Sequence, residues 1–208
     1  YTAKYRSEIL KKWYLLIKKN KKEISKIITL ESGKPSTESE TEVEYGASFI
    51  EWFAEQSLRV SGEIFNSPDI KKKMMTIKQP IGVVSAITPW NFPLAMVTRK
   101  TSAALACGCT VVLKPSELTP ITSIKLAELA LEAGVPPGVL NVVNGNPKII
   151  GKILSTHPFV KKITFTGSTN VGKLLMRNAS NTVKSVSLEL GGNAPFVVFD
   201  DSNLENAV

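Results

Sequence analysis

Histidine and cysteine are scarce in this 208-residue sequence, which holds one His and two Cys. The lone His157 cannot complete a metal-binding cluster with the two cysteines, so no metal site is predicted. Cys107 and Cys109 are two residues apart, a spacing that rarely forms a disulfide, so no secreted disulfide scaffold is predicted. Both cysteines are expected to pack as small core residues. The predicted compartment is a reducing one, the cytoplasm or the mitochondrial matrix, and not a secretory one.

Long apolar runs are also missing. No stretch approaches the roughly 20 apolar residues that a membrane-spanning helix needs, and no signal peptide is visible, so no membrane partner is predicted. The chain begins at Tyr1 without an initiator Met, and residues 203–208 read as the start of a helix. We therefore expect both ends to be cut, which leaves room for a targeting segment before Tyr1.

Positive charge is concentrated at the N-terminus. The net charge is +8, and residues 1–35 hold ten Lys/Arg against three Glu, which gives 10 − 3 = +7. Apolar residues such as Ile9, Trp13 and Ile17 recur there at helical spacing, which places most lysines on the opposite face. A nucleic-acid groove would interleave aromatics with the exposed basic residues. A solvated helix face is therefore favoured and no nucleic-acid partner is predicted; steep salt dependence of DNA binding would indicate the alternative.

The pattern changes from helices to alternating strands and helices along the chain. Helices are expected at 2–19, at 21–32 and through 43 to 62, followed by an extended stretch at 73–78. Apolar, β-branched runs predict strands at 81–87, 110–113, 139–143, 162–166 and 183–188, with helices at 93–106, 119–133, 148–154 and 170–179 between them. The predicted fold class is therefore α/β, a doubly wound parallel sheet with N-terminal helices, in one unit over residues 1–208.

Polar residues and glycines cluster where the predicted strands end. Ligands bind at the carboxyl ends of the strands in such sheets, so five converging loops predict a nucleotide site and make about 80–208 the cofactor-binding part. These loops are Thr88-Pro89-Trp90-Asn91, Lys114-Pro115-Ser116-Glu117, Asn144-Gly145, Gly167-Ser168 and Glu189-Leu190-Gly191-Gly192.

The segment from Gly167 to Lys173 begins like a phosphate-binding loop of an NTPase. Such a loop needs Ser or Thr at the next position to bind magnesium, and Leu174 has no oxygen to offer. What remains is a strand that ends in glycine and runs into a helix, whose amides and dipole can receive a pyrophosphate, with the Ser168 hydroxyl as a further donor. An ordinary tight turn explains the segment equally well.

Lys114 and Glu117 follow a buried strand, where charged residues are usually solvated loop residues. As part of a nucleotide site, Glu117 can accept hydrogen bonds from the two hydroxyls of an adenosine ribose. A 2′-phosphate would replace one donor with negative charge, so NAD is predicted as the cofactor, with NADP possible.

Asn91 and Glu189 are the candidate catalytic residues. A side-chain amide at a strand end can donate to a developing oxyanion, although Asn91 also suits a turn. Glu189 ends an apolar strand, where apolar company would raise its pKa and suit a general base. A partnered structural Glu is the alternative.

Four strings occur in the order of one enzyme family: Thr88-Pro-Trp-Asn-Phe-Pro, Gly108-Cys-Thr-Val-Val-Leu-Lys-Pro-Ser-Glu, Phe165-Thr-Gly-Ser and Leu188-Glu-Leu-Gly-Gly. Through them essentially all 208 residues resemble the aldehyde dehydrogenase superfamily. Thr98-Arg99-Lys100 and the stretch from Asn193 to Asp201 resemble its succinate-semialdehyde branch.

The resemblance implies a reaction and a set of site residues. A cysteine thiolate attacks the aldehyde, hydride passes from the thiohemiacetal to NAD, and the thioester is hydrolysed to a carboxylate. Asn91 would help to form the oxyanion hole and Glu189 would activate the water. The expected cofactor residues are Thr88, Trp90, Arg99, Lys114, Pro115, Ser116, Glu117, Gly167, Ser168, Gly172 and Leu190.

The family's catalytic cysteine lies downstream of Glu189, and this chain ends at Val208 without it. Cys107 and Cys109 precede the lysine strand and are no substitute. We therefore expect an incomplete aldehyde dehydrogenase domain, inactive alone, from an enzyme that takes a small aldehyde, most closely succinate semialdehyde, and that forms a homo-oligomer, a tetramer or dimer. The alternatives are another substrate branch or a non-catalytic nucleotide-binding member of the family.

Overall fold

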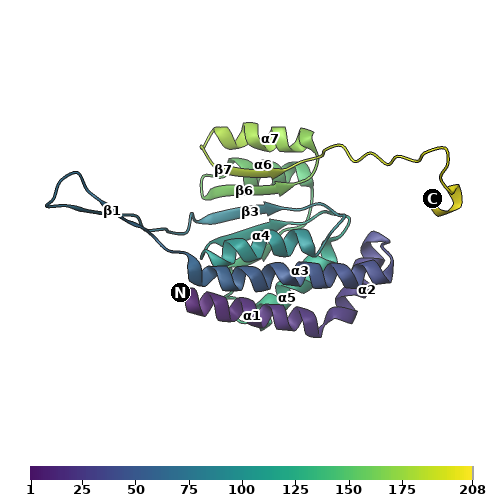
Figure 1. Cartoon of the computed structure of the whole chain (residues 1–208), viewed down its shortest axis with the longest axis horizontal. Coiled ribbons are helices and arrows are strands. Elements are labelled where there is room, and N and C mark those ends of the chain that lie inside the picture. Colours follow the sequence, from purple (N-terminus) through teal and green to yellow (C-terminus); the bar gives the residue numbers. More distant parts are fainter. Residues whose placement is uncertain (208) are drawn as a thin grey trace.

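A computed structural model describes residues 1–207 as a sheet between helices, with one projecting arm and an extended C-terminal segment (Figure 1). Three helices open the chain, α1 (Ala3–Lys19), α2 (Lys21–Ser32) and α3 (Ser36–Gln56), followed by the 3₁₀ turn η1 (Ser57–Arg59). The first two confirm the predicted helices. Their buried residues include Ile9, Trp13, Ile17 and Ile24, so most of the lysines between them face solvent.

The third helix ends six residues before the predicted Gly62. The chain leaves the helix because residues 62–64 join a β-hairpin, in which the Glu63 amide donates to Thr76 Oγ1 at 3.0 Å. Gly62 runs so close to the Thr76 carbonyl that a Cβ at this position would overlap it. Gly62 therefore belongs to the base of the hairpin and not to the helix, as the contact with Thr76 shows.

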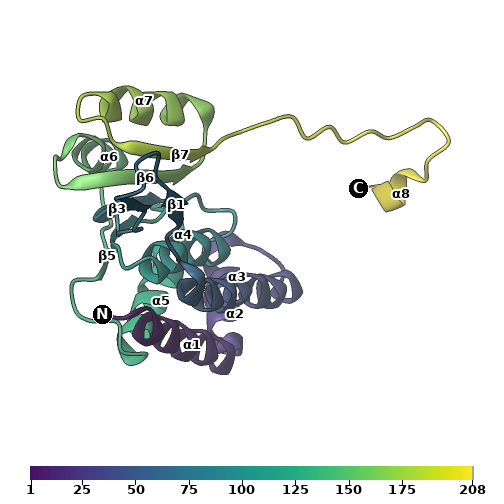
Figure 2. The same ribbon diagram turned by 60° about the vertical axis from the view of Figure 1, so that its left-hand side comes forward.

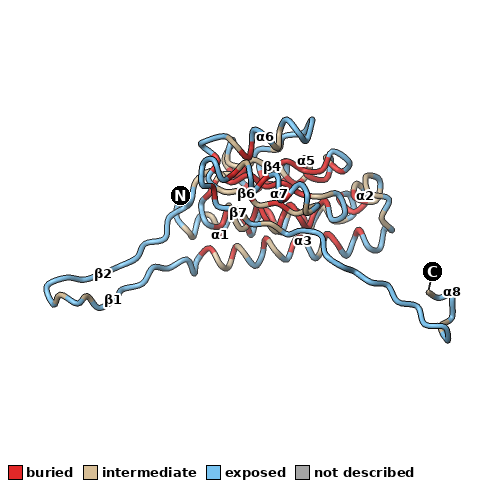
Figure 3. The backbone as a smooth tube through the Cα atoms, turned by 90° about the horizontal axis from the view of Figure 1, so that it is seen from above, coloured by how far each residue is buried: buried red, intermediate tan, exposed pale blue. Residues whose placement is uncertain are grey.

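The hairpin forms an arm outside the globular body (Figures 1 and 3). Its strands β1 (Ile64–Asn66) and β2 (Lys73–Met75) pair antiparallel, with Ile64 opposite Met75. The second strand agrees with the predicted extended stretch, whereas the first was not predicted. All six strand residues are exposed, so no alternation of buried and exposed positions marked β1 in the sequence.

Five parallel strands form the main sheet: β3 (Val83–Ile87), β4 (Thr110–Lys114), β5 (Leu140–Val142), β6 (Val160–Thr166) and β7 (Ser185–Glu189). Their order across the sheet is β5-β4-β3-β6-β7, and every neighbouring pair is parallel. The chain runs from β3 to one edge and returns to the other side of β3, which confirms the doubly wound fold class. The strand order reverses between β3 and β6, where such sheets bind ligands.

Helices cover both faces of the sheet (Figure 2). The helices α4 (Ala95–Ala106) and α5 (Pro120–Glu132) share one core with α1–α3, β3 and β4. The helices α6 (Pro147–Thr156) and α7 (Thr169–Ser180) pack on the other face around Ile163 and Phe165, and α8 (Leu204–Ala207) ends the chain. Among the described residues, no helix is long and apolar enough to cross a membrane.

Candidate functional site

A cleft of about 210 Å³ opens at the carboxyl ends of β3, β4 and β6. Six of the predicted cofactor residues line it: Thr88, Lys114, Ser116, Glu117, Gly167 and Ser168. Pro147 and Gly151 of α6 also line the cleft and were not predicted, because neither residue has a polar side chain that would indicate a ligand. We call this cavity the strand-end cleft. It lies at the reversal of strand order, as the fold class predicts.

Thr88 is the most informative residue of the strand-end cleft. It directly follows β3 and is 4% exposed, and its amide donates to the Lys114 carbonyl at 3.2 Å. Its hydroxyl is buried and has no hydrogen-bond partner among the described residues. A buried hydroxyl without a partner costs free energy. Of the four described hydroxyls in this state, those of Ser85, Thr88, Thr119 and Ser123, only that of Thr88 belongs to a residue lining this cleft, where a ligand can supply the missing hydrogen bond.

Lys114 and Glu117 form an ion pair at the opening of the cleft, with 2.5 Å between Nζ and Oε2. The lysine side chain is 6% exposed and the glutamate side chain 51%. The hydrogen bond from Lys114 holds the pKa of the Glu117 carboxyl below its usual value. Glu117 is therefore an ionised acceptor that a polar ligand can reach, and the lysine holds it in place.

The turn from β6 into α7 lines the same cleft and places the N-terminus of α7 there. The Ser168 hydroxyl caps α7 by accepting from the Val171 amide at 3.4 Å, and the Gly167 amide donates to the Glu189 carbonyl at 3.0 Å. A Cβ on Gly167 would lie 2.5 Å from the Phe165 ring, so a larger residue in this turn would displace that ring. The N-terminus of α7 can receive an anionic group, as predicted for a pyrophosphate.

Four other predicted cofactor residues lie beside the strand-end cleft rather than in its lining. Pro115 is buried behind the Lys114 loop, and Trp90 is 53% exposed. Gly172 of α7 packs against Leu190, where a Cβ would lie 2.5 Å from the leucine Cδ2. Gly172 and Leu190 therefore fix α7 against the end of β7.

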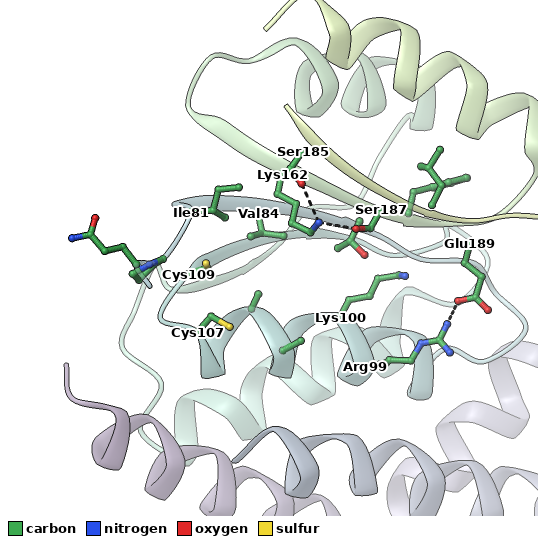
Figure 4. Close-up of a pocket in the computed structure, with 17 residues that line it drawn as sticks. Ile81, Val84, Arg99, Lys100, Cys107, Cys109, Lys162, Ser185, Ser187 and Glu189 are labelled. Atoms are coloured by element: carbon green, nitrogen blue, oxygen red, sulfur yellow. Dashed lines mark hydrogen bonds and ion pairs between the residues drawn. The ribbon is translucent and has the colours of Figure 1, made fainter. Parts of the chain in front are cut away.

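A second cleft of about 590 Å³ runs along the α4 side of β6 and β7 (Figure 4). Arg99 and Glu189 form an ion pair at one end of this cleft. Lys100 donates to the Thr166 hydroxyl at 2.7 Å, and Lys162 donates to the Ser187 hydroxyl at 2.7 Å. We call this cavity the cationic cleft, because three cations and one carboxylate line it.

Two expectations about these residues are wrong. The Glu189 carboxylate does not lie in apolar company: its side chain is 60% exposed and pairs with Arg99, because β7 is an edge strand and Glu189 is on its open face. Cys109 is buried as expected, but Cys107 is exposed. Cys107 follows the last residue of α4, where the helix end faces the cationic cleft.

Sequence reasoning missed Lys34 and Glu42, which contact the Asn91 loop from the N-terminal helices. Lys34 donates to the Asn91 carbonyl at 2.8 Å, and Glu42 accepts from the Leu94 amide at 2.9 Å. One signal was present in the sequence. Glu42 falls on the buried face of α3 together with Val43, a position at which a carboxylate needs a partner.

A doubly wound sheet, a buried free hydroxyl at its strand-order reversal, an accessible carboxylate and a helix N-terminus together define a dinucleotide-binding domain. These groups suit the ribose and phosphate parts of a dinucleotide in the strand-end cleft. The aldehyde dehydrogenase family model matches residues 1–208. The chain belongs to the aldehyde dehydrogenase family.

Similar proteins with curated names are succinate-semialdehyde dehydrogenases. The chain is 61% identical over 207 residues to the mitochondrial enzyme of Arabidopsis thaliana and 53% identical over 210 residues to that of Homo sapiens. It is 52% identical over 207 residues to succinate-semialdehyde dehydrogenase [NADP(+)] GabD of Escherichia coli. All of this chain is covered, but only 39%, 39% and 43% of those proteins, so the chain spans about two fifths of their length.

Solved structures agree with this family. Succinate-semialdehyde dehydrogenase from Burkholderia pseudomallei superimposes with a TM-score of 0.93 at 53% identity, covering all of this chain and 43% of that one. A betaine aldehyde dehydrogenase mutant from Staphylococcus aureus, in complex with NAD⁺, superimposes with a TM-score of 0.92 at 37% identity, covering all of this chain and 42% of that one.

Proposed function

We propose that the whole protein oxidises an aldehyde to a carboxylate with NAD or NADP. The observation that carries this proposal is the Thr88 hydroxyl, buried without a partner in a cleft that Glu117 and the α7 N-terminus also line. When bound, the dinucleotide supplies the hydride acceptor. Glu117 then accepts from the ribose hydroxyls, which favours NAD, because a 2′-phosphate would place negative charge beside this carboxylate.

Asn91 and Glu189 are the proposed catalytic residues. Asn91 follows β3 after Trp90, and its side-chain amide donates to the oxygen that becomes negatively charged when a thiolate adds to the aldehyde. Glu189 takes a proton from the water that releases the acid. The thiolate itself comes from a cysteine outside residues 1–208.

Succinate semialdehyde is the proposed substrate, because its second end carries a carboxylate. Arg99, Lys100 and Lys162 line the cationic cleft, in which Glu189 is the one carboxylate (Figure 4). A guanidinium binds a carboxylate through two parallel hydrogen bonds, so Arg99 is the best-suited anchor. The names of the relatives point to the same substrate.

Replacing Arg99 by Met tests this substrate assignment in the whole protein. Since a hydrogen bond to a charged group contributes about 1.5–3 kcal/mol, kcat/KM for succinate semialdehyde should fall roughly 10- to 100-fold. Steady-state NADH formation measures the change. Butanal, which has no carboxylate, is the control substrate and should lose less than about threefold. An equal loss with both aldehydes would contradict the anchor and point to a role of Arg99 through Glu189.

The whole protein is further proposed to be a homo-oligomer in which a second copy covers the hairpin arm. An isolated two-stranded hairpin is marginally stable in water. Ile64 is 76% exposed and Met75 64%, on an arm that extends beyond the body of its own chain (Figure 3). Such exposed apolar strands mark contact surfaces.

An Ile64→Lys, Met75→Lys double variant should therefore reduce the assembled mass of the whole protein. The two residues face each other across the hairpin, so the variant places two like charges on one surface of the arm. Analytical ultracentrifugation measures the result. Leu30→Lys on α2, at a residue 76% exposed in the body, is the control and should leave the mass unchanged. An unchanged mass for the arm variant would exclude the arm from the interface.

The mitochondrial matrix or the cytoplasm is the proposed compartment. The plant and human relatives carry the word mitochondrial in their names, whereas the Escherichia coli relative is bacterial.

A further inference from the structure

Two charged residues from the N-terminal helices meet at the loop that carries Asn91. Lys34 lies between α2 and α3, and Glu42 lies on α3. The turn from α2 to α3 lies at the same end of the molecule as the carboxyl ends of the strands (Figure 1). The lysine Nζ and the glutamate Oε2 are 2.5 Å apart, with side chains 12% and 1% exposed. An ion pair this deeply buried is not a solvated surface pair.

Glu42 holds the segment that follows Asn91. Its Oε1 accepts from the amides of Leu94, at 2.9 Å, and Ala95, at 3.3 Å. Leu94 is the N-cap residue of α4 and Ala95 is its first residue, and the Leu94 side chain makes no capping hydrogen bond. A carboxylate at a helix N-terminus satisfies free amides and complements the helix dipole. The start of α4 is therefore fixed by a residue from another helix.

Lys34 holds Asn91 itself. Its ammonium donates to the Asn91 carbonyl at 2.8 Å and lies 4.0 Å from the centroid of the Phe92 ring. The same ammonium binds Glu42, so one pair of charges holds the backbone at Asn91 and again at Leu94. The peptide units on both sides of the Asn91–Phe92–Pro93 segment therefore have little freedom.

Helices α3 and α4 also pack closely beside Glu42. Gly46 lies one turn beyond Glu42 on α3, and a Cβ there would overlap Leu94 and lie 3.1 Å from Ala95 Cα. The absence of a side chain at Gly46 therefore allows α3 to approach α4 closely enough for Glu42 to reach the α4 amides.

We propose that Lys34 and Glu42 are positioning residues that hold the Asn91 side-chain amide in the orientation in which it donates to the reacting oxygen. The inference rests on the proposed role of Asn91. Neither residue touches the reacting atoms; both act through the backbone of the loop. An amide that points in several directions spends only part of its time in the useful one, so loosening this backbone lowers kcat.

The test compares Lys34→Met and Glu42→Gln with Glu44→Gln in the whole protein. Glu44 is the matched control, because it lies on the same helix two residues further on and pairs instead with Lys18 and Lys21. Both test variants should lower kcat roughly 10-fold or more, as expected for a misplaced donor, and should change the KM for NAD less than about twofold. Lys34→Arg keeps the charge and should restore most of kcat. Glu44→Gln should change neither constant.

A double-mutant cycle separates positioning from general loss of structure. If Lys34 acts through Asn91, the Lys34→Met, Asn91→Ala double variant should be no slower than Asn91→Ala alone. The positioning role would be overturned if the kcat of the double variant were reduced by the product of the two single losses. It would also be overturned if Lys34→Met alone caused no loss in kcat. A normal kcat for Asn91→Ala would instead overturn the proposed function of Asn91, so the two failures are distinguishable.

Amide exchange gives a readout that needs no turnover. In the whole protein, Glu42→Gln should speed hydrogen exchange of the Leu94 and Ala95 amides at least about 10-fold relative to Glu44→Gln, because their acceptor loses its charge and its lysine partner. If Glu42→Gln fails to fold, Lys34→Met carries the same measurement. Unchanged exchange at both amides would contradict the proposal.

Discussion

Purified residues 1–208 are expected to bind NAD and to reduce none of it when succinate semialdehyde is added. The strand-end cleft with Thr88, Glu117 and the N-terminus of α7 lies within the described residues, and these are the groups proposed to hold the ribose and phosphates. The cysteines, by contrast, lie at the wrong end of the sheet. Cys109 directly precedes β4 and Lys114 ends it, so a rise of about 3.3 Å per residue separates the two residues by roughly 16–17 Å along the strand.

The electrostatic surroundings of Cys107 also argue against a catalytic role for this cysteine. The Cys107 residue is exposed, but its sulfur is partly covered by the surrounding protein. This partial burial, followed by the neighbouring Cys109, raises the pKa of the Cys107 thiol above its usual value, so less of it is thiolate at neutral pH. A catalytic cysteine needs the opposite shift. Figure 4 shows both cysteines at the far end of the cationic cleft from Glu189.

Calorimetric titration with NAD and the absorbance of NADH measure the two halves of this prediction. Thr88→Val keeps the shape of the side chain and removes the hydroxyl, so the Kd for NAD should rise roughly 5- to 10-fold, the equivalent of one hydrogen bond. Ser85→Ala is the matched control, because Ser85 also carries a buried hydroxyl without a partner on β3 but does not line the cleft. Formation of NADH, or equal effects of the two substitutions, would contradict the prediction.

The sheet was predictable because its strands are continuous apolar runs and its connections are helix-length. Parallel strands of that kind place their carboxyl ends together, which is why the sequence alone assigns Thr88, Lys114 and Gly167 to one site. The exposed strand β1 could not be found in this way, since a strand with no buried face has no period-two pattern to read.

Side-chain surroundings were less predictable than strand ends, and Glu189 shows why. Its neighbours in the sequence are apolar, but they alternate in direction, so Leu188 packs toward the α6 and α7 core while Glu189 faces the open side. Its ion-pair partner Arg99 is 90 residues away in the chain. Lys34 and Asn91, which also contact each other, are 57 residues apart in the chain. Pairs of this kind depend on how the layers pack, which local spacing does not record.

Replacing Lys100 by Met is expected to stabilise the folded chain at neutral pH by up to about 3 kcal/mol. Burial, followed by the neighbouring charge of Arg99, lowers the pKa of Lys100 to about 8 from an ordinary value of 10.5. The residue is 9% exposed, and its ammonium donates to the Thr166 hydroxyl. One neutral oxygen does not replace the water that a charged ammonium loses on burial.

The stability gained by Lys100→Met should decrease as the pH rises. Below about pH 8 the lysine is charged in both the folded and unfolded chains, so the full cost of burying the charge is present. Between about 8 and 10.5 the folded chain has lost this proton while the unfolded chain still binds it. The unfolded state then binds more protons, so the stability of the natural chain rises with pH and the advantage of Lys100→Met shrinks to little above 10.5.

Urea unfolding of both chains across this pH range measures the difference in the free energy of unfolding. Lys78→Met, at an exposed position, is the control and should shift that free energy by less than about 0.5 kcal/mol at any pH. A Lys100→Met difference that stays constant with pH would show that the Lys100 amine titrates alike in both states. The ammonium would then have to be hydrated within the cationic cleft and would keep its charge up to its ordinary pKa of 10.5 instead of losing it above about 8.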